Sequence, residues 1–227
     1  MTKRFSEEIR RMLEGADAIW TYEGPPRPEA PHALFTSGRH SDGYADVGKF
    51  LKDHQLERVL IANFLLEALY QVWNDKFTRV VGADTSSTAL AADVAEISAV
   101  HHIRMVKTDD GKDKRQVWHP DNPPLLESDI TLHVEELITT TLSAIHVRTG
   151  IEEANPGISI NHVPFLPVVV ERSNPDDRVK KVSGSIILPL LQLEIRNYHP
   201  SYCPYCLAGS EAIKPKVEDN WKKLTGK

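Results

Sequence analysis

The amino-acid sequence predicts an α/β protein in which a mostly parallel sheet is flanked by helices. Two stretches, residues 78–97 and 130–147, show the same order of elements: a short apolar run, a turn rich in small and hydroxyl residues, and a segment with helical spacing. Strands of parallel sheets are buried on both faces and are therefore nearly continuous apolar runs. A strand, a turn and a covering helix in that order are the repeating unit of α/β sheets.

Length and composition fit a globular protein with one hydrophobic core. The chain has 227 residues, of which 41% are hydrophobic and 26% are charged, and its net charge is −5. We expect a single domain over residues 1–227, with a small hood formed by about residues 1–50 and 184–227. The negative charge argues against nucleic acid as a partner. No apolar run is long enough to cross a bilayer, so we expect no membrane association.

The first fifty residues predict a helix, a linker and a tight turn. Apolar residues recur at helical spacing over 5–20, with Ser6 as the expected N-cap. This segment does not resemble a signal peptide, and two cysteines are too few for a disulfide framework, so we expect a cytoplasmic protein. A proline-rich linker over 23–31 follows. A short strand then enters a polar turn that presents Arg39 and His40.

The remaining elements alternate between strands, helices and polar loops. We expect a helix over 56–73, strands over 101–106, 158–162, 165–170 and 186–195, and polar loops over 107–115 and 173–181. The loop 107–115 is charged and rich in turn-forming residues, so its general interpretation is a mobile, solvated loop.

The strongest site candidate follows the apolar run 130–134. Two adjacent carboxylates, Glu135 and Glu136, precede two apolar residues, three threonines and the start of a helix. Backbone amides at a helix N-terminus bind phosphate, and hydroxyl groups add donors. The carboxylates can accept hydrogen bonds from vicinal hydroxyls or help to hold a divalent cation. A sugar phosphate suits all three features, and the alternative is a plain surface turn after a buried strand.

A second candidate is the turn over residues 83–87, Ala-Asp-Thr-Ser-Ser, between the strand 78–82 and the next helix. Its amides and hydroxyls again lie at a helix N-terminus, where an anion is stabilised. The alternative is an ordinary turn whose hydroxyls only cap the helix.

Four segments together carry a resemblance to a known family. They are Ser37–Asp42 with Tyr44, Glu135–Thr140, the basic residues of 107–118, and the ending 202–215 with its Cys-Pro-x-Cys and Lys-Pro. In content and order they resemble the N-terminal substrate segment, the phosphoribosyl pyrophosphate motif, the mobile loop and one type of C-terminal ending of the orotate phosphoribosyltransferases. These belong to the type I phosphoribosyltransferase family.

The resemblance implies an enzyme of pyrimidine nucleotide biosynthesis. It would join orotate, or a related base, to phosphoribosyl pyrophosphate and release pyrophosphate. The resemblance also implies Mg²⁺ as the cofactor. It implies a homodimer, because a neighbouring subunit usually supplies the loop lysine in this family.

The resemblance further implies roles for individual residues. The catalytic residues would be Lys107, Glu135 and Glu136, with the two glutamates holding ribose hydroxyls and, mostly through substrate, the metal. The substrate-binding residues would be Arg39, Lys49, Ala83, Asp84, Thr85, Ser86, Ser87, Arg115, Thr139, Thr140, Thr141, Leu142 and Ser143. In this scheme 139–143 hold the 5′-phosphate. The turn 83–87, with Lys107 and Arg115, holds pyrophosphate, and Arg39 and Lys49 face the base or the partner site.

Five positions depart from the family's pattern. Thr141 and Ser86-Ser87 stand where the family has glycines, Val106 stands where an acid precedes the loop lysine, and Ala45 replaces an aromatic residue. These departures leave two alternatives: a non-catalytic protein that binds a nucleotide or regulates, and a transferase for a different base. For Thr141 we expect a helical φ with its hydroxyl as an added phosphate donor, because a left-handed φ strains a β-branched residue.

The pair Cys203-x-x-Cys206 allows three interpretations. A zinc site needs four ligands, and only His199 is near in the sequence, so a site within one chain lacks ligands. A thioredoxin-like redox pair would precede a helix in a βαβ unit, whereas this pair lies in a proline-rich tail. We favour a structural turn, with a metal site shared between subunits as the next alternative.

Overall fold

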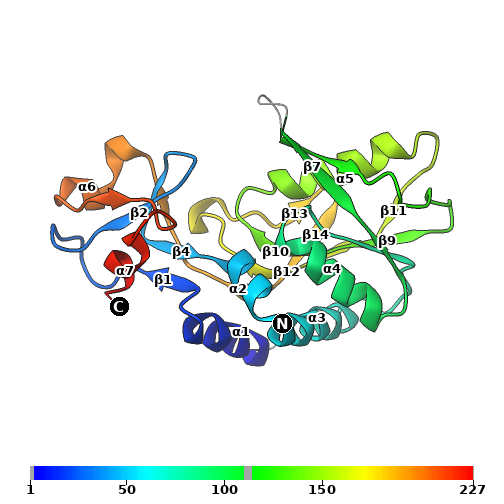
Figure 1. The fold of residues 1–227 in the computed structure, drawn as a ribbon, viewed down its shortest axis with the longest axis horizontal. Helices are drawn as coiled ribbons and strands as arrows, with labels where there is room; N and C mark the ends of the chain where they lie inside the picture. The colour runs from blue at the N-terminus through cyan, green and yellow to red at the C-terminus, as the bar shows by residue number, and fades with distance from the viewer. Residues whose placement is uncertain (1–2, 110–113, 227) are drawn as a thin grey trace.

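The chain forms a core of sheets and helices with a smaller hood beside it (Figure 1). The computed structural model describes residues 3–109 and 114–226. Strands from the middle of the chain build the core, and residues 19–45 and 197–226, blue and orange to red in Figure 1, meet in the hood. Within the described residues, no helix is long and apolar enough to cross a membrane.

The first core sheet holds the strand before the turn 83–87 and the strand before the acidic pair Glu135-Glu136. Its order is β11-β9-β5-β6, and all neighbouring strands are parallel. The strands are β5 (Arg79–Val81), β6 (His101–Ile103), β9 (Ile130–His133) and β11 (Asn161–His162). Val80 of β5 and Leu132 of β9 are fully buried, as is Val81 on the opposite face. β9 buries Thr131 and His133 as well as its apolar residues, so both faces of the central strands are covered, as in other parallel sheets.

The second core sheet continues from the first at Val134. Its order is β10-β12-β14-β13, and only the last pair is antiparallel. The strands are β10 (Glu135–Ile138), β12 (Phe165–Glu171), β13 (Lys181–Val182) and β14 (Ser185–Gln192). Val134 alone separates β9 from β10, and its N–H donates to the carbonyl of Val81. The acidic pair therefore opens the second sheet at the point where the two sheets meet.

Helices cover both faces of the core. They are α1 (Lys3–Gly15), α2 (Val47–Asp53), α3 (Gln55–Tyr70), α4 (Ser86–Ile97) and α5 (Leu142–Ala154). α1, α3 and α4 lie on one side of the sheets and α5 on the other (Figure 1). α3 and α4 share one hydrophobic cluster with Val80, while α5 shares another with Val81. The predicted α/β class, a mostly parallel sheet flanked by helices, is confirmed.

The first helix is shorter than the sequence predicts. It ends before residue 20, because Ile19–Thr21 form the strand β1. Asp17, between the two elements, has a φ of 51°, and a right-handed helix cannot continue through a positive φ. Ser6 is not the N-cap as predicted. It lies within α1, where its hydroxyl donates to the carbonyl of Leu190 at 2.8 Å.

The hood joins the two ends of the chain. Its main sheet has the order β15-β3-β2-β16, and β1 pairs with β4 beside it. The strands are β2 (His32–Leu34), β3 (His40–Ser41), β4 (Gly43–Ala45), β15 (Asn197–Tyr198) and β16 (Ala212–Ile213), followed by the helices α6 (Pro204–Leu207) and α7 (Asn220–Thr225). No strand of the main sheet exceeds three residues. Backbone pairing alone therefore gives the hood little stability.

One side chain of the hood turn is oriented differently from the prediction. Arg39 is exposed, as expected. His40, which we expected to be presented beside it, belongs to β3 and is only 8% exposed. The ring of His40 instead lies inside the hood, where its Nδ1 is 2.9 Å from Nε2 of His32.

The segment predicted as a charged, mobile loop is a β-hairpin. β7 (Met105–Asp109) pairs antiparallel with β8 (Lys114–Trp118). Residues 110–113 of the predicted loop lie outside the described residues. The hairpin packs closely on α5: a Cβ added at Gly150 would lie 2.0 Å from the carbonyl oxygen of Gln116. Glycine is therefore required at that point of α5.

Candidate active site

A cleft of about 690 Å³ opens between the hood and the second core sheet. The hood contributes Leu34–Ser37, Arg39, Tyr44, Asn197 and Lys214–Val217, and the core contributes Thr139, Thr140, Arg172 and Asn174. Thr139 follows β10 and Arg172 follows β12, which are neighbouring parallel strands. The core wall of the cleft thus lies at the carboxyl ends of parallel strands, where α/β proteins bind ligands.

The two glutamates of β10 differ in their surroundings. Glu135 is 3% exposed, whereas Glu136 is partly exposed. Successive side chains of a strand point to opposite faces, so an adjacent pair in β10 cannot share one environment. The sequence predicted both carboxylates at the sheet edge, and the structure buries Glu135 and exposes Glu136 in part. Their contacts with a ligand stay a prediction.

Glu135 is held in a chain of buried polar groups. Its carboxylate lies 2.7 Å from Nε2 of His133 and 2.7 Å from the hydroxyl of Ser87. Ser87 accepts from the amide of Glu136 at 3.0 Å, so its own proton is donated to Glu135. Arg148 Nε donates to Nδ1 of His133 at 3.3 Å, so a neutral His133 carries its proton on Nε2. This chain fixes α4 and β10 relative to each other.

Burial controls the protonation of these groups. It lowers the pKa of His133 well below the usual value, and the charge of Arg148 acts in the same direction. It raises the pKa of Glu135, although the hydrogen bond from Ser87 opposes that rise. It also raises the pKa of Glu136, and the neighbouring Glu135 adds to the effect. A cation or hydroxyl donor at Glu136 would relieve this repulsion.

The loop between β10 and α5 presents hydroxyl groups at a helix N-terminus. Among the described residues, no hydrogen bond involves the hydroxyls of Thr139, Thr140, Thr141 or Ser143. Leu142 begins α5, and Glu135 lines a hollow of about 30 Å³ together with residues 137–144. Amides and uncommitted hydroxyls around a small hollow make a site for a phosphate-sized anion.

Thr141 adopts a left-handed backbone, with φ of 62° and ψ of −8°. The predicted helical φ is therefore wrong. This conformation costs a β-branched residue on the order of 1–3 kcal/mol. The side chain makes no capping hydrogen bond that would offset the cost. Glycine adopts this conformation without strain, which is the physical reason for a glycine in a loop of this shape.

Hydroxyl groups order the turn before α4. Thr85 caps the helix by accepting from the amide of Ser87 and donates to Glu136 at 3.2 Å. Ser86 donates to the carbonyl of Gly48 at 3.0 Å, so its hydroxyl faces α2. Neither serine has a positive φ. The replacement of a glycine pair by Ser86-Ser87 therefore introduces no backbone strain.

Asp84 fixes the hairpin to this turn. Its carboxylate accepts from the amide of Lys107 at 2.8 Å, and its own amide donates to the side chain of Gln116 at 2.7 Å. The side chain of Lys107 is exposed, and Ala83 is fully buried. Arg115 lines a separate hollow of about 240 Å³ beside α5. The structure thus places Lys107 near the turn but does not bring Arg115 into the cleft.

The two basic residues expected near the base lie in different hollows. Arg39 lines the cleft. Lys49, on α2, pairs with Asp53 and lines a second hollow of about 740 Å³. Tyr44 lines both hollows. Arg39 is therefore brought to the candidate active site, and Lys49 is not.

Arg172 is the site residue that the sequence analysis missed. It is 8% exposed, and its guanidinium lies 4.6 Å from the ring of Phe35 and 6.0 Å from that of Tyr44. Nε and Nη1 have no hydrogen-bond partner among the described residues. Burial lowers the pKa of Arg172 to about 10, so it stays charged at neutral pH. A buried cation with unpaired donors in a cleft wall favours an anionic ligand.

A signal for Arg172 was present in the sequence. Glu171 and Arg172 directly follow the apolar run 165–170, which was predicted to be a strand. Charged residues directly after a buried parallel strand stand at the edge where ligands bind.

With this geometry in view, the chain was compared with known proteins. No protein-family model matches it. It is 24% identical over 193 residues to the orotate phosphoribosyltransferase of Campylobacter concisus, which covers 83% of this chain and 92% of that protein. The crystal structure of orotate phosphoribosyltransferase from Aeropyrum pernix is 17% identical, with a TM-score of 0.58, over 82% of this chain and 94% of that chain.

Two further solved structures match. Adenine phosphoribosyltransferase from Thermoanaerobacter pseudethanolicus is 17% identical, with a TM-score of 0.50, over 66% of this chain and 88% of that chain. Leishmania donovani UMP synthase is 16% identical, with a TM-score of 0.57, over 83% of this chain but only 36% of that chain.

These matches define the class of protein. The chain has the fold of the type I phosphoribosyltransferases. Within this class, its named relative and the Aeropyrum pernix structure are both orotate phosphoribosyltransferases. The resemblance inferred from the four sequence segments is thereby confirmed.

Proposed function

We propose that this chain transfers the phosphoribosyl group of phosphoribosyl pyrophosphate to orotate and releases pyrophosphate. The observation that carries this proposal is the buried guanidinium of Arg172, whose Nε and Nη1 lack partners among the described residues in the wall of the cleft. Orotate bears a carboxylate that a guanidinium binds through charge-assisted hydrogen bonds. Adenine and uracil lack a carboxylate and would leave the buried cation uncompensated.

The sugar phosphate would bind along the loop that follows β10. The N-terminus of α5 and the hydroxyls of Thr139 and Thr140 would hold the 5′-phosphate. Glu136, which is partly exposed, would accept hydrogen bonds from the ribose hydroxyls. Glu135 touches Ser87 and His133 instead. We therefore assign Glu135 a positioning role, in place of the ligand contact expected from the sequence.

The pyrophosphate would lie beside the turn before α4. Thr85 and the side chain of Lys107 are exposed there. Mg²⁺ binds through one or two carboxylates together with phosphate oxygens. Glu136 fits this requirement, because its carboxylate is partly exposed and lies beside the turn before α4, where Thr85 donates to it. When bound, Mg²⁺ would neutralise charge on the pyrophosphate.

A pyrophosphate-release assay tests the base. Orotate should support turnover, and uracil and adenine should not. Arg172→Met should lower kcat/KM for orotate by about 10–100-fold, the value of a hydrogen bond to a charged group. The control is Arg104→Met, because Arg104 is exposed and pairs with Asp121. Equal turnover of a neutral base, or an Arg172→Met protein with parental activity on orotate, would refute the assignment of orotate.

We also propose a homodimer in which Lys107 acts at the partner's site. The support is that Lys107 is exposed at the start of the hairpin. Mixing Lys107→Ala protein with Glu136→Ala protein should restore activity, because one site of a mixed dimer then has both residues intact. If both variants are inactive alone and the mixture stays inactive, Lys107 does not act across a dimer.

A non-catalytic nucleotide-binding or regulatory protein is the second candidate. It is favoured by the strained φ of Thr141 and by the interior position of Glu135. This candidate predicts binding of phosphoribosyl pyrophosphate in calorimetry without pyrophosphate release for any base. Turnover with any base excludes it, and turnover with a base other than orotate would establish the alternative transferase.

A further inference from the structure

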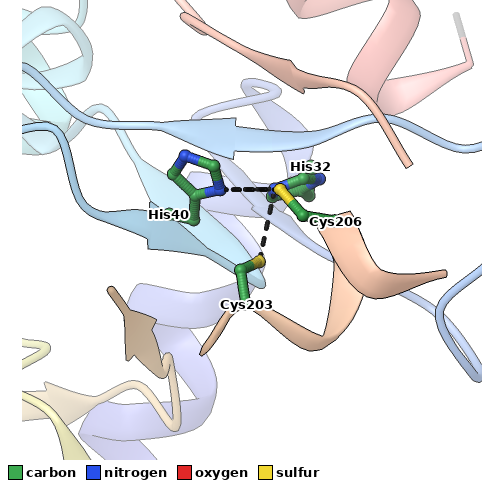
Figure 2. Close-up of side chains that lie close together, drawn as sticks. All are labelled: His32, His40, Cys203 and Cys206. Carbon is green, nitrogen blue, oxygen red and sulfur yellow. Dashed lines mark hydrogen bonds between the residues drawn. The ribbon is translucent and has the colours of Figure 1, made fainter. Parts of the chain in front are cut away.

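Four metal-ligating side chains converge inside the hood (Figure 2). His32 comes from β2, His40 from β3, and Cys203 and Cys206 from the turn at α6. One ligand atom from each residue lies within 4.8 Å of the other three. Three of the four side chains are buried, and Cys206 is exposed. The two histidines are thus the ligands that the sequence did not place near the cysteines.

The separations match those of a tetrahedral zinc site. Nε2 of His32 lies 2.9 Å from Nδ1 of His40, 3.5 Å from the sulfur of Cys203 and 3.6 Å from the sulfur of Cys206. Nδ1 of His40 lies 3.2 Å from the sulfur of Cys206. Tetrahedral zinc with the usual Zn–N and Zn–S bond lengths separates its ligand atoms by about 3.3–3.8 Å. These four separations lie within a few tenths of an ångström of that range.

The hydrogen bonds of His32 leave a lone pair aimed at the cluster. The hydroxyl of Ser210 donates its one proton to the carbonyl of Ala30 at 2.6 Å. Towards Nδ1 of His32, 2.8 Å away, Ser210 therefore only accepts, and Nδ1 carries the ring proton. Nε2 of the neutral ring is then unprotonated and faces His40 and the cysteines. Metal-binding histidines show this arrangement, with the other ring nitrogen donating to a fixed acceptor.

We propose that His32, His40, Cys203 and Cys206 bind one structural zinc ion. Two thiolates and two imidazoles in a closed tetrahedral set favour Zn²⁺ over harder cations such as Mg²⁺. A redox role for the cysteine pair would not explain why two histidine nitrogens, 2.9 Å from each other, lie beside the thiols. Without an ion, His40 Nδ1 can donate a hydrogen bond to the unprotonated Nε2 of His32, and a bound ion would replace that hydrogen bond with coordination by both nitrogens.

The zinc ion would join the two ends of the chain. His32 and Cys203 are 171 residues apart in the sequence. The strands of the main hood sheet have only two or three residues each. Small units with short strands need a metal or a disulfide to be stable. The segments that carry the four ligands also form the hood wall of the cleft. Arg39, which lines the cleft, precedes His40, and the lining residues Lys214–Val217 follow β16. The ion would therefore set the shape of the cleft from outside it.

Metal analysis of the full chain, expressed without a histidine tag, tests the proposal. The parent should contain about one zinc per chain, and Cys203→Ser and Cys206→Ser should lose it. His199→Gln is the matched control and should retain zinc, because His199 lies near the cluster in sequence but outside it. A parent that takes up no zinc on reconstitution, or a Cys203→Ser and Cys206→Ser double variant that keeps it, would overturn the proposal.

Two measurements do not depend on the folding of the cysteine variants. In the parent, both thiols should react with a disulfide reagent only after a chelator removes zinc, and equal reactivity before and after would contradict coordination. Co²⁺ added to the zinc-free parent should give the visible bands of a tetrahedral thiolate site, and octahedral bands would contradict it. Ser210→Ala should weaken Co²⁺ affinity by about 10–100-fold, because it removes the acceptor that orients His32.

Discussion

Buried histidines occur in both the core and the hood, and their partners differ. In the core, both ring nitrogens of His133 have protein partners, Arg148 on one side and Glu135 on the other. In the hood, His32 uses Nδ1 for Ser210, while its Nε2 faces another histidine and two cysteines. The core arrangement is balanced by protein charges alone. In the hood, the proposed zinc ion would take the place of such charged partners.

The difference follows from the amount of apolar surface around each cluster. The core cluster lies between sheets and helices that share an extensive hydrophobic core. Fully buried polar groups there can be held by packing and by one another. The hood sheet has strands of two or three residues, so its histidines and cysteines are surrounded by little regular structure. The same residue type thus serves as a hydrogen-bond link in one region and as a candidate metal ligand in the other.

The largest effect is expected from breaking the core chain. Arg148→Met removes the donors to His133 and Ser185 and so breaks the chain that runs from Arg148 through His133 to Glu135. Removal of one partner from a buried charged network costs about 3–5 kcal/mol. Urea unfolding should show this loss in the free energy of unfolding. Arg104→Met, which breaks an exposed pair, should change it by less than about 1 kcal/mol. Equal effects of the two variants would mean that the core chain contributes no more than a surface pair.

The next effect concerns the hood alone. Zinc removal should accelerate amide hydrogen exchange over residues 32–45 and 197–213 at least tenfold, since local opening there lacks an extensive core to oppose it. Exchange in β12 should not change, because that strand lies in the core. Equal acceleration in both regions would show that the hood is not a separately stabilised unit.

A smaller effect should appear as pH dependence. Burial lowers the pKa of His162 to about 3, and the charges of Arg148 and His133 act in the same direction. An unfolded histidine has a pKa of about 6.5. Between about pH 3 and pH 6.5, His162 binds a proton in the unfolded chain but not in the native chain. The stability from His162 is therefore fully present above about pH 6.5 and is lost as the pH falls towards 3.

His162→Gln should accordingly reduce the loss of stability between pH 7 and pH 5 by about 1 kcal/mol, a value discounted for partial exposure. Urea unfolding at a series of pH values measures it. His133 should keep part of the acid sensitivity, because its pKa is also lowered by burial. The exposed His101 provides the control His101→Gln. A parental slope in His162→Gln would place the acid sensitivity elsewhere.

The smallest effect is expected at the phosphate loop. Thr141→Gly should raise the free energy of unfolding by about 0.5–1 kcal/mol, because relief of the left-handed φ outweighs the greater flexibility of glycine in the unfolded chain. Thr140→Gly is the control and should be destabilising, since Thr140 has no positive φ. Binding of phosphoribosyl pyrophosphate should be at least as strong in Thr141→Gly. A loss of stability there would mean that the threonine side chain makes a favourable contribution that exceeds the strain.

Local sequence determined the order of elements and the place of the phosphate loops. Apolar runs such as 130–134 and 165–170 predicted buried strands, since parallel strands need apolar side chains on both faces. Hydroxyl-rich turns before helices predicted the loops before α4 and α5. The prediction failed for the helix over 5–20 and the loop over 107–115, because a positive φ at Asp17 and pairing between β7 and β8 are not visible in periodicity.

Only the tertiary structure decided which side chains meet. Alternation along a strand separates Glu135 from Glu136, but the packing of α4 against β10 determines which of the two is buried. Thr141 takes its left-handed φ because the chain must turn from β10 into α5 there, whatever residue stands at that point. The cysteines meet His32 and His40 across more than 160 residues, through pairing of β16 with β2 and of β15 with β3. Such contacts cannot be predicted from short-range sequence patterns, because they depend on how distant segments pack.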